Sequence, residues 1–326
     1  MALPATTPIL TPFNLEIVQV ELSSKCVLKC PRCPRTELAL PYLNQEISTE
    51  DFVRAFTPKV LSQIKYLLFC GHTGDPIYAT NLLDVVEYVK SVSDTRIRIV
   101  TNGSYKKSDW WQQLGQLLDS DDGITFSIDG WDDQSNNQYR IDSNWTSIVS
   151  AIKILKNTSA CYVNWSTIYF NFNQDHIERI IAAAKELGCD QMRLIKSAKF
   201  GAEYAVDGID LLQPTRDYVS TDNNYQRGKI VFVREDPFVI EKTQQCHPWA
   251  KCLNGAKEIN VTVQGHVYPC GWFNTGYNSN SFVEKWQDRI NIRSRSLIEI
   301  LEDPLWSELT NAFNLQICEI KCRSCP

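Results

Sequence analysis

The sequence contains no long hydrophobic run and no excess of basic residues. No apolar stretch among its 326 residues approaches the ~20 residues of a membrane-spanning helix, so we expect no membrane partner. Lysine and arginine number 33 against 38 acidic residues, and the net charge of −5 argues against nucleic-acid binding, which depends on basic surface. The first residues lack the basic and apolar segments of a signal peptide. We therefore expect a cytoplasmic protein.

Cysteine, in contrast, is abundant, with 12 residues in the chain. In a reducing compartment such thiols are expected to bind metals or to take part in catalysis rather than to form disulfides. Nine of them fall into three groups, which are Cys26, Cys30 and Cys33, then Cys246, Cys252 and Cys270, and finally Cys318, Cys322 and Cys325. Cys70, Cys161 and Cys189 stand alone beside apolar neighbours, where a cysteine acts as a small buried hydrophobe.

Short apolar runs alternate with longer amphipathic stretches from about residue 15 to 195. Strands are expected at 16–22, 65–70, 96–100, 123–128, 161–169 and 191–195. Helices are expected at 49–64, 80–93, 107–119, 144–157 and 174–187. The last helix has Ile177, Ile180, Ile181, Ala184 and Leu187 on one face, and Gly188 ends it. Strands that alternate with helices predict a parallel α/β sheet with its chemistry in the loops at the carboxyl ends of the strands.

The rest of the chain has a different pattern. We expect residues 1–14 to be an extension and 196–245, which are irregular and rich in Asp and Tyr, to be a bridge between domains. Residues 246–326 form the predicted second domain, in which 258–263 and 266–268 flank Gln264-Gly265 as a hairpin. A helix is expected over 297–313, where Pro304 can kink or break it. This small domain has little core of its own, which favours a metal-stabilised unit.

The first cysteine group follows the first predicted strand directly, as Cys26-Val27-Leu28-Lys29-Cys30-Pro31-Arg32-Cys33. Three thiolates on one short loop can hold three irons of a cubane cluster and leave the fourth iron open for another ligand. A zinc site would prefer a fourth protein ligand, and the nearest histidine, His72, is on a different loop. A structural zinc knuckle stays open as the alternative.

This spacing resembles the signature of the radical S-adenosylmethionine (SAM) enzymes. The loop after the second strand, Cys70-Gly71-His72-Thr73-Gly74-Asp75-Pro76, is similar to the Gly-Gly-Glu-Pro loop of that family, with Thr73 for the first glycine and Asp75 for glutamate. The resemblance implies that Thr73, Gly74 and Asp75 hold the amino group of SAM. Because aspartate is one methylene shorter than glutamate, we expect backbone carbonyls of this loop to contribute more to binding the amino group.

Similar motifs follow the next two strands. Thr101-Asn102-Gly103 comes after the third, and Ser127-Ile128-Asp129-Gly130, with Tyr139-Arg140 farther on, comes after the fourth. In the family such a serine and arginine contact the ribose and carboxylate of SAM, so the resemblance implies a SAM site that includes Asn102, Ser127, Asp129 and Arg140, with Asn164, Ser166 or Thr167 beside it. The resemblance covers about residues 15–195 and implies a partial (β/α)6 TIM-like barrel.

The carboxy-terminal part resembles the SPASM/twitch extension of this superfamily, which carries auxiliary iron–sulfur clusters. The resemblance rests on the predicted hairpin that ends at Cys270 and on Ser296-Leu297-Ile298-Glu299-Ile300-Leu301, which resembles the helix that follows it. It implies a small β-hairpin and helix domain with one auxiliary [4Fe–4S] cluster, held by Cys252, Cys270, Cys322 and Cys325, with Cys318 and Cys246 as alternate ligands. Two auxiliary clusters and a four-thiolate zinc site stay open as alternatives.

The family resemblance implies an enzyme that cleaves SAM reductively and abstracts hydrogen from a substrate with the resulting 5′-deoxyadenosyl radical. A peptide or protein side chain is the expected substrate, to be oxidised, crosslinked or epimerised, and the expected electron donor is external and flavodoxin- or ferredoxin-like. The absence of a further recognition domain before residue 15 or after 326 points instead to a small substrate, as for a dehydrogenase of a carbohydrate-like molecule. An electron-transfer or redox-sensing protein without SAM cleavage, and a zinc-stapled binding module, are alternatives of other classes.

Overall fold

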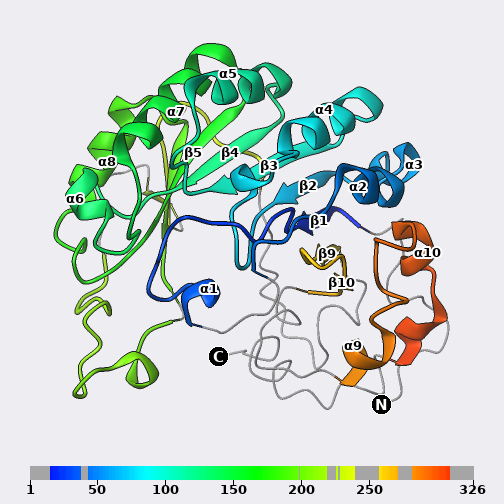
Figure 1. Ribbon diagram of the computed structural model, residues 1–326. Helices are drawn as coiled ribbons and strands as arrows, with labels where there is room; N and C mark the ends of the chain where they lie inside the picture. The colour runs from blue at the N-terminus through cyan, green and yellow to red at the C-terminus, as the bar shows by residue number, and fades with distance from the viewer. Residues whose placement is uncertain are drawn as a thin grey trace. The chain divides into compact units, whose positions relative to one another are not determined.

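The structure, a computed structural model, describes residues 15–37, 43–197, 199–218, 225–226, 228–238, 257–270 and 281–308 (Figure 1). The chain divides into two compact units. Among the described residues, unit 1 contains 15–25, 43–97 and 257 onward, and unit 2 contains 26–37 and 98–238.

Unit 1 is built on parallel strands β1 (Ile17–Val20) and β2 (Tyr66–Phe69). On its other edge β1 pairs in parallel with β9 (Glu258–Val261), and β10 (Val267–Tyr268) returns antiparallel to β9. The predicted hairpin is therefore confirmed. Its turn includes Gly265 at a φ of +90°, a backbone conformation that glycine adopts readily. The parallel pairing of β9 with β1 joins segments about 240 residues apart and was not predicted.

The described helices of unit 1 are shorter than the predicted ones where a proline intervenes. They are α2 (Thr49–Ala55), α3 (Pro58–Leu61), η2 (Pro76–Tyr78), α4 (Leu82–Val92), α9 (Ser281–Trp286), α10 (Leu297–Leu301) and η6 (Pro304–Glu308). The helix predicted over 49–64 is two helices, because Pro58 occupies the first turn of α3 and Thr57 caps it. The helix predicted over 297–313 ends at Leu301, and Pro304 begins a separate 3-10 turn; residues 309–313 lie outside the described ranges.

Unit 2 continues the alternation with β3 (Arg96–Thr101, its first two residues counted in unit 1), β4 (Gly123–Ser127), β5 (Tyr162–Ile168) and β6 (Gln191–Ile195). Successive strands from β3 to β6 pair in parallel. The six predicted strands are thus confirmed to within two residues at each end. Within the stretch predicted to be an irregular bridge, β8 (Lys229–Val231) pairs antiparallel with β6, and β7 (Tyr225–Gln226) pairs antiparallel with β8.

The described helices of unit 2 are α1 (Pro34–Glu37), α5 (Ser108–Leu117), α6 (Asp133–Asn136), α7 (Trp145–Thr158), α8 (Ile177–Glu186) and the 3-10 turn η3 (Ala202–Tyr204). Figure 1 shows α5, α7 and α8 along one side of the strands of this unit. In α8 the predicted apolar residues Ile177, Ile180, Ile181 and Ala184 are buried, whereas Leu187 directly follows the helix and is only partly buried. Gly188 comes next, at a φ of +77°. No helix in the described ranges has both the length and the apolar composition to cross a membrane.

The core of unit 2 lies between these helices and the strands. Phe126 of β4, Trp165 of β5 and Ile152 of α7 are completely buried. Burial of a large apolar side chain stabilises a fold by about 1.5–3 kcal/mol, so this core holds the strand ends in place. The loops at the carboxyl ends of β3 to β6 therefore start from fixed positions, and the candidate site is built on them.

Candidate functional site in the loops after the strands

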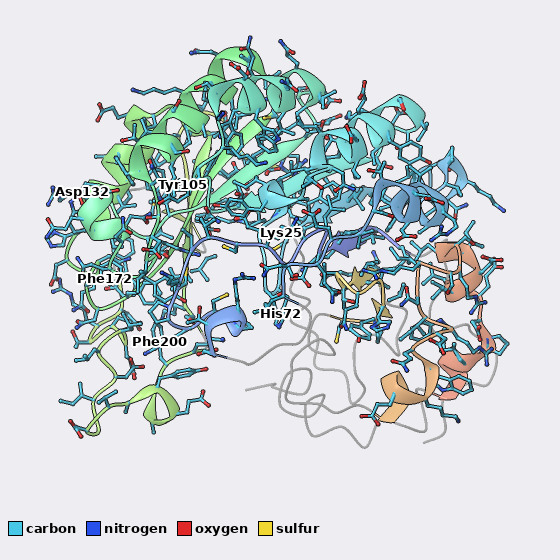
Figure 2. The ribbon with its side chains drawn as sticks, viewed as in Figure 1. Lys25, His72, Tyr105, Asp132, Phe172 and Phe200 are labelled. Atoms are coloured by element: carbon cyan, nitrogen blue, oxygen red, sulfur yellow. The ribbon has the colours of Figure 1, made fainter. Side chains whose placement is uncertain are left out.

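The three cysteines of the first group come together on one apolar cluster of unit 2. Leu28, Cys30, Tyr139 and Phe170 are its buried members, and Cys26, Cys33, Ile168, Phe172, Phe200 and Leu212 pack against it. Phe172 and Phe200 are labelled in Figure 2. The backbone closes the loop locally, since the Cys33 N–H donates to the Cys30 carbonyl at 3.1 Å and the Lys29 N–H donates to the Ile141 carbonyl at 3.0 Å.

Three thiols on one loop are a ligand set that a cubane cluster can use, because each cysteine binds a different iron. Among the described residues, no group of three His, Cys, Asp or Glu side chains is placed to hold a metal ion. Burial raises the pKa of the Cys30 thiol, and the positive charge of nearby Arg140 acts in the opposite direction. Thiolates that bind iron are negatively charged, and a guanidinium beside them offsets that charge.

Arg140 is held by Asp129, the buried carboxylate that follows β4. The Arg140 Nε donates to Asp129 Oδ2 at 2.6 Å, and the Asp129 side chain has no exposed surface. Asp129 Oδ1 accepts from the Ile168 N–H at 2.7 Å, so both carboxylate oxygens are engaged. Burial by itself lowers the pKa of Arg140, but the negative charge of Asp129, together with those of Cys30 and Tyr139, outweighs burial and the net pKa is raised. The guanidinium therefore stays charged, and 17% of its side chain remains exposed.

Asn102 connects the loop after β3 to the cysteines. Its Nδ2 donates to the Cys26 Sγ at 3.7 Å, while its Oδ1 accepts from the Ser104 N–H at 2.9 Å. The side chain is buried, so its amide is fixed in this orientation. An N–H donor directed at a ligating sulfur is one of the ways a protein tunes an iron–sulfur cluster.

Ser127, at the end of β4, is half-buried and stands in register with Ser166 of β5. One residue farther along β5, the Thr167 hydroxyl donates to the Ile128 carbonyl at 2.7 Å and is fully buried. Asn164 is also buried, but its Nδ2 donates to Asp236 Oδ2 at 2.7 Å, within the network of Arg98 and Asp236. Of the three residues expected to lie beside the SAM site, Ser166 is thus the one that pairs with Ser127.

The loop after β2 belongs to unit 1 and is organised by Glu21, which follows β1. Glu21 Oε1 accepts three hydrogen bonds, from the His72 N–H at 2.9 Å, the Thr73 N–H at 2.7 Å and the Thr73 hydroxyl at 2.8 Å. His72 is labelled in Figure 2. Thr73 and Glu21 are both buried. Sequence reasoning missed Glu21, although an acidic residue between apolar strand residues was a signal that could have identified it.

The rest of this loop is fixed by close backbone approaches. A Cβ at Gly74 would lie 2.1 Å from the Ser23 carbonyl oxygen, so no other residue fits there without displacement. The Asp75 N–H donates to the Lys25 carbonyl at 2.9 Å, one residue before Cys26 in the chain. Asp75 Oδ1 caps η2 by accepting from the Ile77 N–H at 3.2 Å. Burial, with the charges of Asp75 and Glu21, raises the pKa of Cys70 to about 12.

A second buried ion pair covers the cysteine loop and was also missed. Arg32, between Cys30 and Cys33, pairs with Asp210, and both side chains are less than 10% exposed. Arg32 also donates to the Lys199 carbonyl, and the Lys199 Nζ donates back to the Arg32 carbonyl at 2.7 Å. These contacts hold the segment from Lys199 to Asp210 against the cysteine loop. No sequence signal links Arg32 to an aspartate 178 residues away.

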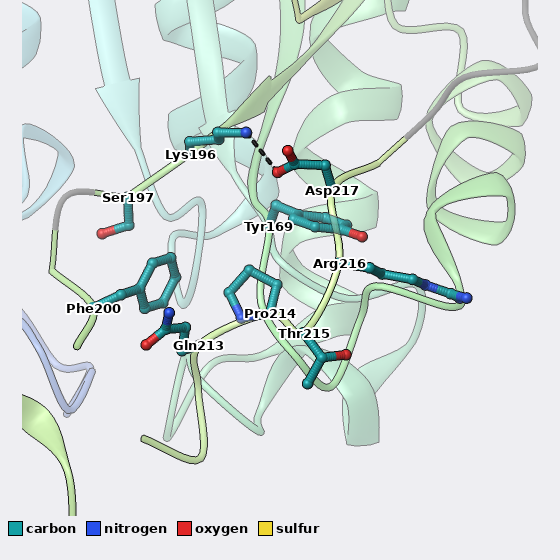
Figure 3. A pocket seen from close by; sticks show the side chains of 9 residues that line it. All are labelled: Tyr169, Lys196, Ser197, Phe200, Gln213, Pro214, Thr215, Arg216 and Asp217. Atoms are coloured by element: carbon teal, nitrogen blue, oxygen red, sulfur yellow. Dashed lines mark hydrogen bonds and ion pairs between the residues drawn. The ribbon is translucent and has the colours of Figure 1, made fainter. Parts of the chain in front are cut away.

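A pocket of about 400 Å³ opens beside the cysteine loop in unit 2 (Figure 3). It is lined by residues that follow β5 and β6 and by the segment 213–217, namely Tyr169, Lys196, Ser197, Phe200, Gln213, Pro214, Thr215, Arg216 and Asp217. Figure 3 shows the hydrogen-bonded ion pair between Lys196 and Asp217, which are 2.6 Å apart. Phe200 borders the pocket and also packs against the cysteine cluster, so the two are neighbours.

The remaining cysteines divide in two. Cys161 and Cys189 are buried, and burial raises their pKa values to about 11 and about 12, which confirms them as small buried hydrophobes. Cys270 lies two residues after β10, partly buried. Cys246, Cys252, Cys318, Cys322 and Cys325 lie outside the described residues, so the predicted auxiliary ligand set stays a prediction.

Several solved structures are similar to this chain, SuiB and anSMEcpe among them. SuiB of Streptococcus suis bound to S-adenosylmethionine superposes with a TM-score of 0.61 at 16% identity, covering 90% of this chain and 67% of SuiB. SuiB bound to the precursor peptide SuiA gives the same TM-score and identity, over 90% of this chain and 66% of SuiB. Native anSMEcpe with bound AdoMet and the Kp18Cys peptide gives 0.56 at 16% identity, over 92% and 84%. The chain thus spans about two thirds of the length of SuiB.

No protein-family model matches the sequence, and no curated protein matches it significantly. The structural similarity nevertheless defines the fold, because it extends over nine tenths of the chain. The predicted α/β fold class is confirmed, and the fold is the one that SuiB and anSMEcpe have.

Proposed function

We propose that the chain is a radical SAM enzyme that binds a [4Fe–4S] cluster through Cys26, Cys30 and Cys33. The observation that carries the proposal is that the three cysteines of one loop pack on one apolar cluster, with the Asn102 amide on Cys26 and Arg140 beside Cys30. Those residues follow β1, β3 and β4, the carboxyl ends at which α/β folds bind ligands. When bound, the cluster supplies the electron that cleaves SAM to methionine and a 5′-deoxyadenosyl radical.

The chain's own residues bind and orient SAM in this proposal. Arg140, kept charged by Asp129, is the partner for the carboxylate of SAM, and Ser127 is the partner for its ribose. Asp129 itself acts as a positioning residue, because Arg140 and Ile168 already occupy its two oxygens. Asn102 donates to a ligating thiolate and thereby stabilises the charged form of Cys26.

Thr73, Gly74 and Asp75 are proposed to hold the amino group of SAM. Since Asp75 Oδ1 caps η2, backbone carbonyls of this loop are natural acceptors for an ammonium group. Glu21 fixes the loop through Thr73, which explains why threonine stands where the family motif has glycine: its hydroxyl provides the third donor to Glu21.

An auxiliary [4Fe–4S] cluster is proposed for the cysteines near and beyond β10. Cys252, Cys270, Cys322 and Cys325 are the proposed ligands, with Cys318 and Cys246 as alternates. The observation in support is the position of Cys270, which lies two residues after β10. Because β10 pairs with β9 and β9 pairs with β1, this cysteine lies next to a strand that is part of the sheet. An anchored ligand keeps its place while the other cysteines bind, which favours metal-coupled folding of this part of the chain.

A peptide or protein side chain is the proposed substrate. SuiB and anSMEcpe, which share the fold, are solved with peptides bound, and this supports the proposal. The pocket beside Phe200 has about 400 Å³, room for one or two side chains, and combines an aromatic wall with polar groups. We propose that it receives a substrate side chain on the face that adjoins the cysteine loop.

The experiment that tests the function is anaerobic reconstitution with iron and sulfide, followed by SAM and dithionite. Formation of 5′-deoxyadenosine supports SAM cleavage, and its loss in Cys30→Ala ties the activity to the cysteine loop. Reconstitution of a cluster without any 5′-deoxyadenosine would favour an electron-transfer or redox-sensing protein instead. Retention of one zinc ion per cysteine group without iron would favour the zinc-stapled module.

A further inference from the structure

Three apolar side chains near the end of the segment 199–212 are largely exposed. The relative exposures are 69% for Val206, 62% for Ile209 and 72% for Leu211. All three line one hollow of about 280 Å³, beside Pro31 and Arg32 of the cysteine loop. We name the three side chains the 206–211 patch. Exposed apolar residues that are scattered singly are ordinary, whereas three around one hollow indicate a surface that another molecule covers.

The patch is carried by a tight turn that extends away from the strands of unit 2, in yellow-green in Figure 1. Val206 and Ile209 exchange two backbone hydrogen bonds of 3.0 Å. Asp207 and Gly208 between them have positive φ values, of 52° and 80°, which are typical of two-residue hairpin turns. Because the backbone groups of Val206 and Ile209 already pair with each other, a partner contacts the side chains rather than adding a strand.

The inner side of the segment is anchored on the cysteine loop. Arg32 forms its buried ion pair with Asp210, which lies between two residues of the patch. The Arg32 guanidinium also lies over two aromatic rings, with its Cζ 4.6 Å from the ring centroid of Tyr204 and 5.3 Å from that of Phe200. These contacts leave the outer side of the turn to a partner. An anchored surface loses little conformational freedom when a partner binds to it.

The charges of the segment leave its outer side negative. Lys199, the only basic residue of 199–212, pairs with Glu37 at 2.6 Å, and Asp210 is used in its buried ion pair. Glu203 and Asp207 are exposed, and neither carboxylate has an ion-pair partner in the described part of the chain. The patch therefore combines exposed apolar side chains with two uncompensated negative charges. Such a surface suits a partner that presents apolar and cationic side chains.

The same charges disfavour other occupants. A second copy of the chain on a two-fold axis would bring the same carboxylates together, and like charges at an interface are costly. An anionic lipid surface and the phosphates of a nucleic acid would be repelled in the same way. A polypeptide segment that carries bulky apolar side chains and Lys or Arg meets both requirements.

The patch is continuous with the pocket that is proposed to receive the substrate side chain. Leu212 borders the hollow, and Gln213, the next residue, lines the pocket. Phe200 also lines the pocket and contacts Arg32, which borders the hollow. A peptide whose reacting side chain occupies the pocket can therefore reach the patch with residues farther along its chain.

We propose that the 206–211 patch binds an apolar and basic segment of the peptide substrate, outside the pocket for the reacting side chain. The inference rests on the proposed function, because it assigns the flanking part of the proposed substrate. In this arrangement Ile209 and Leu211 cover a bulky apolar side chain of the peptide. Glu203 and Asp207 bind its Lys or Arg. No bond forms or breaks at the patch, which selects substrates by the sequence next to the modified residue.

The experiment uses the reconstituted full chain and two synthetic fluorescent peptides. One peptide repeats leucine and lysine with serine between them, and the other has glutamate in place of every lysine. Binding is measured by fluorescence anisotropy at low and high salt. Leu211→Ser removes part of the apolar surface. Glu203→Gln combined with Asp207→Asn removes the charges, and asparagine tolerates the positive φ at position 207.

Matched controls make the same changes elsewhere on unit 2. Val233→Ser removes an apolar side chain that is 67% exposed and does not line the hollow. Glu186→Gln combined with Asp109→Asn removes two exposed charges of α8 and α5. Both controls should bind the two peptides as the wild type does. SAM cleavage by the wild type with dithionite is measured separately, because peptide binding requires no reduced cluster.

The proposal predicts that the wild type binds the leucine–lysine peptide at least about tenfold more tightly than the leucine–glutamate peptide. Leu211→Ser should weaken that binding about tenfold at both salt concentrations, and the charge variant about tenfold at low salt and less at high salt. Equal affinity for the two peptides, or equal binding by test and control variants, overturns the patch. Wild-type dimers that Leu211→Ser turns into monomers, seen by analytical ultracentrifugation, would assign the patch to a second copy and overturn the proposal. A wild type that binds the peptide as predicted but does not cleave SAM overturns the proposed function and not the peptide-binding surface.

Discussion

The Asp129 carboxylate accepts a hydrogen bond from the Nε of Arg140 at 2.6 Å while it is completely buried. Arg140 in turn lies close enough to Cys30 to influence its pKa, so one buried acid fixes the charge beside the cysteine loop. A buried carboxylate whose two oxygens already accept hydrogen bonds is poorly placed to bind a ligand, but it can hold a neighbouring side chain in position. The effects of changing Asp129 and Arg140 are therefore expected to depend on each other.

This ion pair is tested by measuring SAM binding to the reconstituted protein. Asp129→Asn keeps the shape but removes the charge that holds Arg140, and Arg140→Ala removes the group that contacts SAM. Each should weaken SAM binding roughly tenfold to a hundredfold, the effect of losing a charge-assisted hydrogen bond of ~1.5–3 kcal/mol. The double variant should be no weaker than Arg140→Ala alone. Asp109→Asn, at an exposed position of α5, is the control. Additive losses in the double variant would show that Asp129 contacts SAM directly.

The hydroxyl of Thr73 is predicted to stabilise the loop after β2. Thr73→Val replaces the hydroxyl by a methyl group and leaves Glu21 with two donors instead of three. Loss of a buried hydrogen bond to a carboxylate should lower the free energy of unfolding by about 1.5–3 kcal/mol, measured in urea. Thr80 is a matched control, because its hydroxyl donates to Glu46 at an exposed site, and Thr80→Val should cost less than about 1 kcal/mol. Equal losses in the two variants would contradict the role given to Glu21.

The Arg32–Asp210 pair is predicted to make stability depend on pH. Burial alone raises the pKa of Asp210, but the hydrogen bonds from Arg32 and from the N–H groups of Gly201 and Leu212 outweigh it and lower the pKa. A lowered folded-state pKa adds stability that is fully present above the unfolded pKa of about 3.9 and is lost as the pH falls through the folded value. The wild type should therefore lose this contribution below about pH 4.

Arg32→Ala should remove that acid-sensitive contribution and destabilise the protein at neutral pH by about 3 kcal/mol, because it leaves a buried carboxylate without its partner. Arg216→Ala breaks an exposed ion pair with Asp175 and should cost no more than about 1 kcal/mol. Thermal unfolding between pH 3 and pH 7 measures both variants. An Arg32→Ala protein as stable as Arg216→Ala at neutral pH would show that the pair does not fasten the segment over the cysteine loop.

Iron content tests the two proposed cluster sites. Reconstituted wild type should hold about eight irons per chain as two [4Fe–4S] clusters, and the triple Ala variant of Cys26, Cys30 and Cys33 should hold about four. Cys161→Ala is the control, because its buried thiol is not a proposed ligand. Saturation of the wild type at four irons would remove the auxiliary cluster, and saturation near twelve would indicate two auxiliary clusters.

The local pattern of the sequence predicted most of unit 2 and the elements of unit 1. Alternation of apolar strands with amphipathic stretches located the six parallel strands, because buried strands and helix faces have different periods. The break at Pro304 was one of the expected outcomes for its helix, whereas the break before Pro58 was not expected. Whether a proline ends a helix depends on the capping contacts around it. Thr57 and Asp303, each next to one of these prolines, accept hydrogen bonds from backbone N–H groups and so stabilise the start of a new turn.

Long-range partners could not be predicted in the same way. Nothing in the local sequence pairs Arg32 with Asp210 or β9 with β1, because these contacts join segments brought together only by the tertiary fold. The motifs identified Asp129 and Arg140 as site residues, but they did not predict that Asp129 binds Arg140 and holds it in place. Burial and hydrogen-bond geometry, rather than residue type, separate a group that contacts a ligand from a group that positions it.

The central claim is most directly tested by the products that the reconstituted, anaerobic protein forms from SAM and dithionite. Chromatography with mass detection should show 5′-deoxyadenosine and methionine in equal amounts from the wild type. Neither should form with Cys30→Ala, while Cys161→Ala should match the wild type. Intact SAM in the presence of a correctly assembled and reduced cluster, shown by its electron paramagnetic resonance signal, would contradict the account.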